Sequence, residues 1–170
     1  MTTNYYLAES RRGNAAAAFE ASKVMALEGW SDYFVQQQIY RSAENGHAPA
    51  QRWLGILGLF KRLITKESTV SSISFYETYD VAMEWLNEAA CTGDLVATYI
   101  IAKCCQHGVG IEKDEERALE IFNQVAGKMN EETVLAIMFA FESILQMPCT
   151  SKEITEMNKF DKNGITAKAS

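Results

Sequence analysis

Apolar residues recur along this chain at the spacing of one face of an α-helix, and the helical stretches are separated by glycine. The clearest stretch precedes Gly93 and places apolar side chains at i, i+3, i+4, i+7 and i+8, namely Ala82, Trp85, Leu86, Ala89 and Ala90. This spacing is typical of an amphipathic helix. Proline, which interrupts helical hydrogen bonding, occurs only at Pro49 and Pro148. The pattern therefore predicts an all-α fold.

The helical pattern is repeated along the chain. It begins again at Ala118, 36 residues after the start of the clearest stretch, and keeps apolar residues at Ile121, Phe122, Val125 and Ala126. An earlier copy, 47 residues upstream, has the same small residues at Ala43, Gly46 and Ala50, and a weaker copy has Gly13 33 residues before Gly46. Self-similarity at such periods is the sequence signature of stacked structural repeats.

Each repeat is interpreted as two helices joined by a short turn. Glycine closes the first helix, and Asn14 or Asp94 then follows, where its side chain can cap the next helix. Gly108 and Gly110 form the turn to the next unit, whose helix starts with negative charge at Asp114. Small residues let the paired helices approach closely, namely Ala50, Gly55, Ala97 and Ala102. Since each hairpin leaves an apolar face for its neighbour, we expect an α-α superhelix (a solenoid) of three to four hairpins with a C-terminal capping helix.

One stretch carries a recognisable motif. Residues 82–99 read A-x-x-W-L-x-x-A-A-x-x-G-D-x-x-A-x-Y, and residues 107–118 read H-G-V-G-I-x-x-D-x-x-x-A. This motif resembles the Sel-one-like repeat (SLR) family, since its G-x-G turn and its 36-residue period differ from the 34-residue tetratricopeptide repeat. The unit at 35–60 lacks the G-x-G turn. The resemblance implies a non-enzymatic interaction scaffold, with signalling, secretion-linked or toxin-neutralising roles.

The repeat pattern also predicts how the chain is divided. We expect one helical-repeat domain over residues 1–160, with hairpin units near 3–29, 32–62, 78–108 and 114–146. A polar insert at 61–80 interrupts the regular spacing, and long loops in compact domains are often functional. A capping box at Thr150 and Glu153 predicts a short capping helix over 150–160, followed by a flexible tail at 161–170.

The charge of the chain favours one class of partner. The net charge of −6 argues against nucleic acid, because binding to phosphates needs clustered Lys and Arg. Ten Asp and Glu against three Lys and Arg lie between Glu77 and Glu120, and Glu84 and Glu88 are candidate contact residues. This acidic stretch is interpreted either as a solvated face or as a surface that attracts a protein with a basic surface.

Several aromatic residues are candidate anchors for a protein partner. Large amphipathic rings are common at the centre of protein interfaces. Those near predicted helix starts or in the insert are Trp30, Tyr33, Phe75, Tyr76 and Tyr79. The alternative interpretation is that these rings pack the insert onto the body of the domain.

Catalytic and metal-binding chemistry find little support in the sequence. His107 lies near three cysteines, Cys91, Cys104 and Cys105, but a zinc site needs four ligands at compatible spacings, and buried structural cysteines fit better. Gly108 and Gly110 follow a helix and lack the Lys and Ser or Thr of a phosphate-binding loop. No nucleophile motif is present. We therefore expect no enzymatic activity, no cofactor and no metal.

The sequence also bears on the location of the chain. Its longest apolar runs have eight residues, too short to cross a bilayer, and its N-terminus lacks the features of a secretion signal. We expect a cytoplasmic protein without membrane contact. The leading hypothesis is a bacterial immunity or inhibitor protein that neutralises a secreted toxin by direct binding. A secretion chaperone or signalling adaptor that holds a client peptide, and a metal-dependent enzyme, stay as alternatives; the oligomeric state is open.

Overall fold

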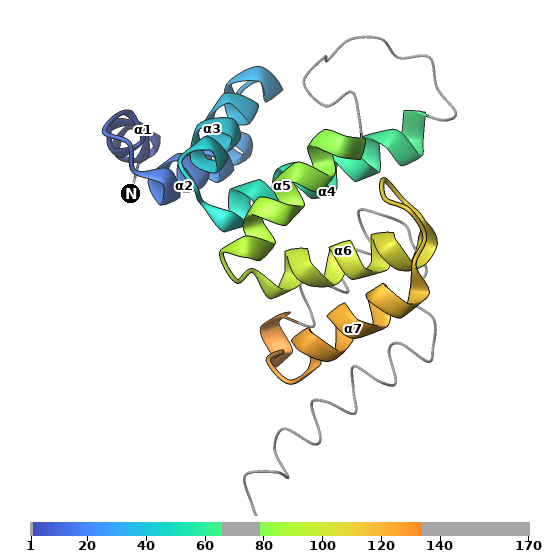
Figure 1. The fold of residues 1–170 in the computed structure, drawn as a ribbon. Coiled ribbons are helices and arrows are strands. Elements are labelled where there is room, and N and C mark those ends of the chain that lie inside the picture. The colour runs from blue at the N-terminus through green and yellow to red at the C-terminus, as the bar shows by residue number, and fades with distance from the viewer. Residues whose placement is uncertain (1, 66–78, 134–170) are drawn as a thin grey trace, which may run out of the picture.

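The structure is a computed structural model that describes residues 2–65 and 79–133. These two ranges contain helices and no strand, and each helix packs against the next one in the chain (Figure 1). The predicted all-α solenoid is confirmed. The helices are α1 (Thr3–Arg11), α2 (Ala15–Leu27), α3 (Asp32–Glu44), α4 (Ala48–Thr65), α5 (Tyr79–Cys91), α6 (Leu95–His107) and α7 (Glu115–Ala126).

The helices are arranged as antiparallel pairs that stack side by side. Helices α1 and α2, α3 and α4, and α5 and α6 form three hairpins, and α7 packs on α6 as the first helix of a further unit. Two core clusters run through the stack, and α4 contributes to both, with Leu54 facing α3 and Leu59 facing α5 and α6. In α3 and α5, the first helices of two successive hairpins, one face stays exposed to solvent. None of the helices in the described ranges is long and apolar enough to cross a membrane.

The turns within the hairpins have the predicted chemistry. Gly93 has a φ of 94° and Gly46 a φ of 82°, a left-handed conformation that a residue with a Cβ adopts only at a cost. The carboxylate of Asp94 then accepts a hydrogen bond of 2.8 Å from the amide of Ala97. The side chain of Asn14 caps α2 in the same way. The predicted glycine closures and both caps are confirmed.

The burial of equivalent residues follows the repeat. Ala50 and Ala97 occupy the same position in two hairpins, and both are fully buried. Ala82 and Ala118, 36 residues apart, are each 1% exposed. The periods found in the sequence therefore correspond to structurally equivalent positions.

Helices α4 and α5 lie unusually close together. A Cβ atom at Gly55 would lie 2.5 Å from Cγ of Leu86, and one at Gly58 would lie 2.7 Å from Cβ of Ala82. The absence of a side chain at these two positions is thus a packing requirement. The sequence predicts close approach at Gly55 within its own hairpin, but the structure places this contact between α4 and α5 of the next hairpin.

The predicted insert at 61–80 is shorter in the structure. Helix α4 continues to Thr65 and α5 already begins at Tyr79, so both ends of the insert are helical. The reason is that 61–65 contains no Gly or Pro and includes good helix formers such as Lys61 and Arg62. The remainder of the insert lies outside the described residues, as do most of the second helix expected near 114–146, the predicted cap at 150–160 and the tail at 161–170.

Candidate protein-binding surface

A group of large apolar side chains is exposed where α2 ends and α3 begins. We call this group the aromatic corner; its exposed fractions are 88% for Leu27, 41% for Trp30, 61% for Tyr33 and 52% for Phe34. The ring of Phe34 makes edge-to-face contacts with Trp30 and with Tyr33, at centroid distances of 6.2 and 5.4 Å. Exposed apolar side chains in mutual contact, as these three rings are, mark an interaction site more often than isolated surface residues do.

The orientation of Trp30 is set by hydrogen bonds. Its indole Nε1 donates to Glu28 over 2.9 Å, and the other carboxylate oxygen of Glu28 accepts from the hydroxyl of Thr3 over 2.6 Å. The bonds from Thr3 and from Trp30 stabilise the carboxylate and lower the pKa of Glu28. Thr3 lies at the start of α1, so the first hairpin holds the ring in place.

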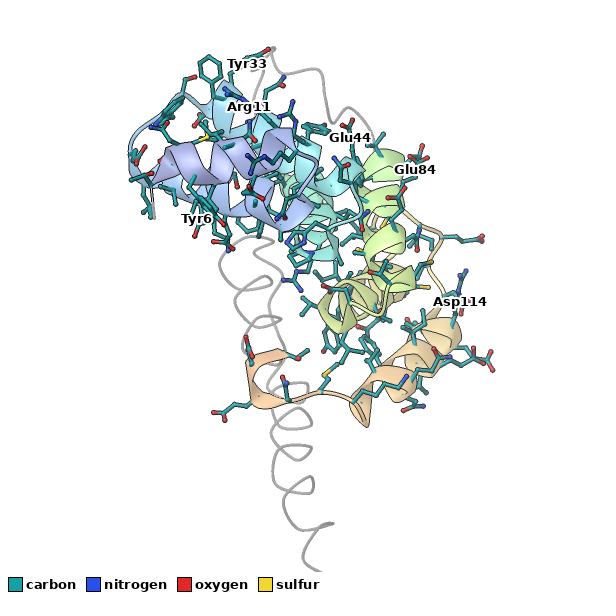
Figure 2. The ribbon with its side chains drawn as sticks, turned by 90° about the vertical axis from the view of Figure 1, so that its left-hand side faces the viewer. Tyr6, Arg11, Tyr33, Glu44, Glu84 and Asp114 are labelled. Carbon is teal, nitrogen blue, oxygen red and sulfur yellow. The ribbon has the colours of Figure 1, made fainter. Side chains whose placement is uncertain are left out.

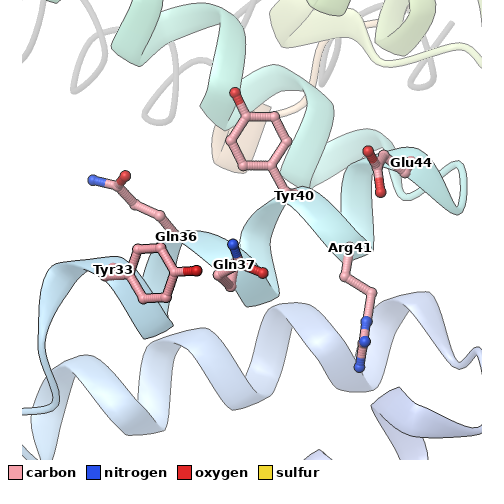
Figure 3. A pocket seen from close by; sticks show the side chains of 6 residues that line it. All are labelled: Tyr33, Gln36, Gln37, Tyr40, Arg41 and Glu44. Atoms are coloured by element: carbon pink, nitrogen blue, oxygen red, sulfur yellow. The ribbon is translucent and has the colours of Figure 1, made fainter. Parts of the chain in front are cut away.

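A pocket of about 340 Å³ lies along the exposed face of α3. Figure 3 shows six side chains that line it, with Arg41 pointing away from Tyr40 and Glu44. Each lining residue lies three or four positions from another, which places them along one side of the helix: Tyr33, Gln36, Gln37, Tyr40, Arg41 and Glu44. Tyr33 belongs to both the aromatic corner and this α3 pocket, so the two are continuous.

The same face continues onto α5. The rings of Tyr40 and Trp85 meet edge-to-face with their centroids 6.4 Å apart. On α5, Glu84 and Glu88 are exposed at positions that correspond in the repeat to residues of the α3 pocket, namely Gln37 and Arg41. Figure 2 shows Tyr33, Glu44, Glu84 and Asp114 following one another along one margin of the molecule.

Glu88 is positioned by a buried residue of α4. The side-chain amide of Gln51 donates to Glu88 over 3.0 Å and to the carbonyl of Ala43 over 3.1 Å, and Gln51 is 4% exposed. Three successive helices are thereby joined at one point. We call the aromatic corner, the α3 pocket, Glu84 and Glu88 together the α3–α5 face.

Charge is divided unevenly along the stack. Residues 2–65 contain seven Lys and Arg against five Asp and Glu, a net charge of +2. Residues 79–133 contain four Lys and Arg against eleven Asp and Glu, a net charge of −7. One of those four cations, Lys103, is only 1% exposed, so the surface of the second part is strongly acidic.

The arrangement of the helices matches a solved structure. The Sel1 repeat protein from Oxalobacter formigenes superimposes with a TM-score of 0.61, and the match covers 78% of this chain and 94% of that one at 23% sequence identity. The chain has the Sel1-repeat fold. This agrees with the resemblance of residues 82–118 to the SLR family.

A second match adds nothing to the fold assignment, because its TM-score is 0.39. It is c5321, a protective antigen of uropathogenic Escherichia coli that displays an SLR fold; the match covers 96% of this chain and 48% of that one at 14% identity. No protein-family model and no curated protein matches the sequence.

Only some of the aromatic residues predicted as anchors from the sequence lie at this surface in the described part of the chain. Trp30 and Tyr33 lie together in the aromatic corner of the Sel1-repeat fold, whereas Phe75 and Tyr76 lie outside the described residues. Tyr79 is half-buried and packs on the core of the third hairpin, because it is the first residue of α5 and lies against the turn at Gly110. The structure therefore gives Tyr79 a packing role, and we do not include it in the α3–α5 face.

Sequence reasoning missed two members of the aromatic corner, Leu27 and Phe34. Their apolar side chains extend helical patterns and would be assigned to the core from the sequence alone. Leu27 is the last residue of α2, and Phe34 lies in the first turn of α3, where no neighbouring helix covers them in the described part of the chain. Only the adjacent Trp30 and Tyr33 gave a signal for this site.

The cysteines near His107 do not form a donor set. In the ranges 2–65 and 79–133, no three or more His, Cys, Asp or Glu residues are grouped as metal ligands would be. Burial, with a smaller contribution from Cys105, raises the pKa of Cys104 to about 12, so its thiol stays protonated. The thiol of Cys105 donates to the carbonyl of Asp114 over 3.3 Å and supports the turn before α7.

The expectation of buried structural cysteines is correct for Cys104 and Cys105 but wrong for Cys91, which is exposed. Cys91 is the last residue of α5 and corresponds in the repeat to Glu44, which is also exposed. Its position on the solvent-facing side of a first helix explains its exposure.

Proposed function

We propose that this chain is a non-enzymatic protein-binding module and that it binds a partner with a basic surface through the α3–α5 face. The observation that carries the proposal is the continuity of that face: exposed rings at one end lead through the α3 pocket to exposed carboxylates on α5. Rings supply apolar contact area to an interface, and carboxylates attract and orient a cationic partner.

The rings have the features of binding anchors. Exposed Trp and Tyr side chains cost little conformational entropy when a partner covers them, because each has two rotatable bonds. Trp30 is already fixed by Glu28 in the free protein. A ring that is held before binding loses less freedom on binding, and this favours affinity.

The finer proposal is an immunity or inhibitor protein of a bacterial cytoplasm that neutralises a secreted toxin by covering it. The acidic second part of the stack supports this, because many toxins that act on nucleic acid or membranes have basic surfaces. A secretion chaperone or signalling adaptor is the second candidate, and the α3 pocket favours it, since a pocket along a helix suits a client peptide.

Co-purification from the native host tests the binding function. The tagged full chain is compared with a variant carrying Glu84→Lys and Glu88→Gln, in which the introduced glutamine can still accept the hydrogen bond from Gln51. The matched control carries Glu131→Lys and Glu132→Gln, the same change in charge at exposed residues beyond α7. Melting temperatures of all three proteins establish that the changes leave the fold intact.

We expect the unaltered chain and the control to retain one stoichiometric partner at low salt, and the α5 variant to lose it. The complex should also weaken as salt rises, because exposed charges are screened. Recovery of no stable partner, or equal recovery by the α5 variant, contradicts the proposed function.

The two candidates differ in what the partner does alone. Expression of the partner without this chain should arrest growth if the partner is a toxin, and co-expression of the chain should restore it. A partner that has no effect on growth and is unfolded by circular dichroism in isolation contradicts the inhibitor function and favours the chaperone.

A further inference from the structure

We infer that the α3–α5 face takes an extended segment of its partner, with a large apolar side chain in the aromatic corner and a Lys or Arg about five residues away. This inference rests on the proposed binding function and adds the chemistry and spacing of the bound segment. The inference follows from three features of the face, in this order along α3: the aromatic corner, the middle of the α3 pocket and the carboxylates at its far end.

The spacing between the apolar and the basic residue of the bound segment follows from the length of α3. Tyr33 lies at the aromatic end of the pocket and Glu44 at the acidic end, eleven residues later on the same helix. At 1.5 Å per residue these positions are separated by about 16 Å. An extended chain covers about 3.3 Å per residue, so about five residues connect the two ends.

The aromatic end is built to hold an apolar side chain. Trp30, Tyr33 and Phe34 are between 41% and 61% exposed, and edge-to-face contacts fix the angles between their rings. A Leu, Met or aromatic side chain placed among them removes apolar surface from water on both partners, which favours binding. Glu28 and Asp32 flank the rings, and their negative charge disfavours an acidic side chain of the partner there.

The middle of the pocket suits a peptide backbone. Gln36 and Gln37 both line it, and each side-chain amide offers two N–H donors and a carbonyl acceptor. Backbone amides and carbonyls of an extended segment need both kinds of partner. The volume of about 340 Å³ is at the lower end of ligand pockets, which fits a few residues of a narrow segment.

The other end selects positive charge. Glu44 lies at the end of the α3 pocket, and α5 presents Glu84 and Glu88 without any Lys or Arg in its sequence. Arg41, the cation of the pocket, points away from Glu44 (Figure 3). Because Gln51 fixes Glu88, a Lys or Arg of the partner meets a carboxylate that is already in position.

A random dodecapeptide library displayed on phage, selected on the full chain, tests this pattern. We expect enriched peptides to combine a large apolar residue with a Lys or Arg four to six positions away. Selection on Trp30→Ala/Phe34→Ala should lose the apolar preference, and selection on Glu84→Lys/Glu88→Gln should lose the basic one. Leu119→Ala removes an exposed apolar side chain from α7 and serves as the control that leaves both preferences unchanged.

Affinities of two enriched peptides, labelled with fluorescein and followed by anisotropy, make the test quantitative. Moving the basic residue to a spacing of one or two, or replacing it with Glu, should weaken binding about tenfold or more, or about 1.4 kcal/mol. Enrichment without a fixed spacing, or with no change in the two variants, overturns the inference.

The remaining outcomes are also decisive. If the partner from the host binds through this face but the library yields no peptide, the extended-segment inference fails and the proposed binding function stands. If neither a host partner nor a peptide is found, both fail. A dimer in light scattering that Trp30→Ala removes shows that a second copy covers the corner, and this also overturns the inference.

Discussion

Arg52 and Asp94 join the second hairpin to the third. The guanidinium Nη1 of Arg52 lies 2.8 Å from Oδ2 of Asp94, and the side chains are 27% and 9% exposed. The other oxygen of Asp94 accepts from the amide of Ala97 and caps α6. One carboxylate therefore fixes the start of a helix and also the position of that helix against the preceding hairpin.

Asp94→Ala is expected to lower the free energy of unfolding by about 2 kcal/mol, of which about 1 comes from the cap and up to about 1 from the ion pair. Asp94→Asn keeps the cap, so it should lose only the free energy that the ion pair contributes. Asn14→Ala removes a cap without an ion pair at the first hairpin and provides the reference. Urea denaturation measures the free energy of unfolding of all three variants. An Asp94→Ala protein as stable as the unaltered chain would contradict a stabilising role for the cap and the ion pair.

Gly55→Ala should destabilise the protein although alanine is the better helix former. The gain in helix propensity is about 1 kcal/mol, but the new methyl group would meet Leu86 and the carbonyl of Ala82, and overpacking costs about 1–3 kcal/mol. Gly127→Ala is the matched control, since a Cβ there meets nothing within 4 Å. Thermal melts should place Gly55→Ala below and Gly127→Ala at or above the unaltered protein; the reverse order contradicts the close packing of α4 on α5.

His47 should make stability depend on pH. Its partial burial, with the positive charge of Lys23 and Arg52 nearby, lowers its pKa below the ordinary value of 6.5, against a smaller opposing contribution from Glu20. The folded state therefore binds a proton less readily than the unfolded chain, and stability falls as pH drops below that value.

The measurement for His47 is the free energy of unfolding at pH 7.5 and 5.5. The loss between these values should be smaller in His47→Gln than in the unaltered protein. Equal losses in the two proteins would mean that His47 does not contribute to the pH dependence.

The cysteines should differ widely in reactivity. Cys91 is exposed and should react with iodoacetamide within minutes at pH 8, whereas the raised pKa and burial of Cys104 keep its thiol protonated and inaccessible. Mass spectrometry of peptides separates the sites. Modification of Cys104 at the rate of Cys91 in the folded protein would contradict its place in the core.

The repeat and the local features of the chain were predictable, whereas the exposure of individual apolar side chains was not. The caps at Asn14 and Asp94 follow from a few neighbouring residues whose chemistry has one structural meaning. The exposure of Leu27, Phe34 and Cys91 does not, because apolar character shows what a residue can bury and not whether a neighbouring helix covers it. The α3 pocket was also missed, since Gln36 and Gln37 are typical of any solvated helix face.

The end of α4 illustrates the same limit. The polar residues after Phe60 suggested a loop from Lys61, yet α4 continues to Thr65, since 61–65 contains no Gly or Pro that would end the helix. Boundaries between elements depend on small differences in free energy between helix and coil, and a pattern of apolar residues does not resolve them.

Photocrosslinking in the native host tests the central claim most directly. A benzophenone amino acid replaces Tyr33 or Glu84 on the α3–α5 face, or Lys23 on α2 or Glu131 beyond α7 as controls. We predict that positions 33 and 84 both crosslink to the same protein, and that positions 23 and 131 do not. Crosslinks to that protein from position 23 or 131 alone, or none from positions 33 and 84, would contradict the claim that this face binds a partner.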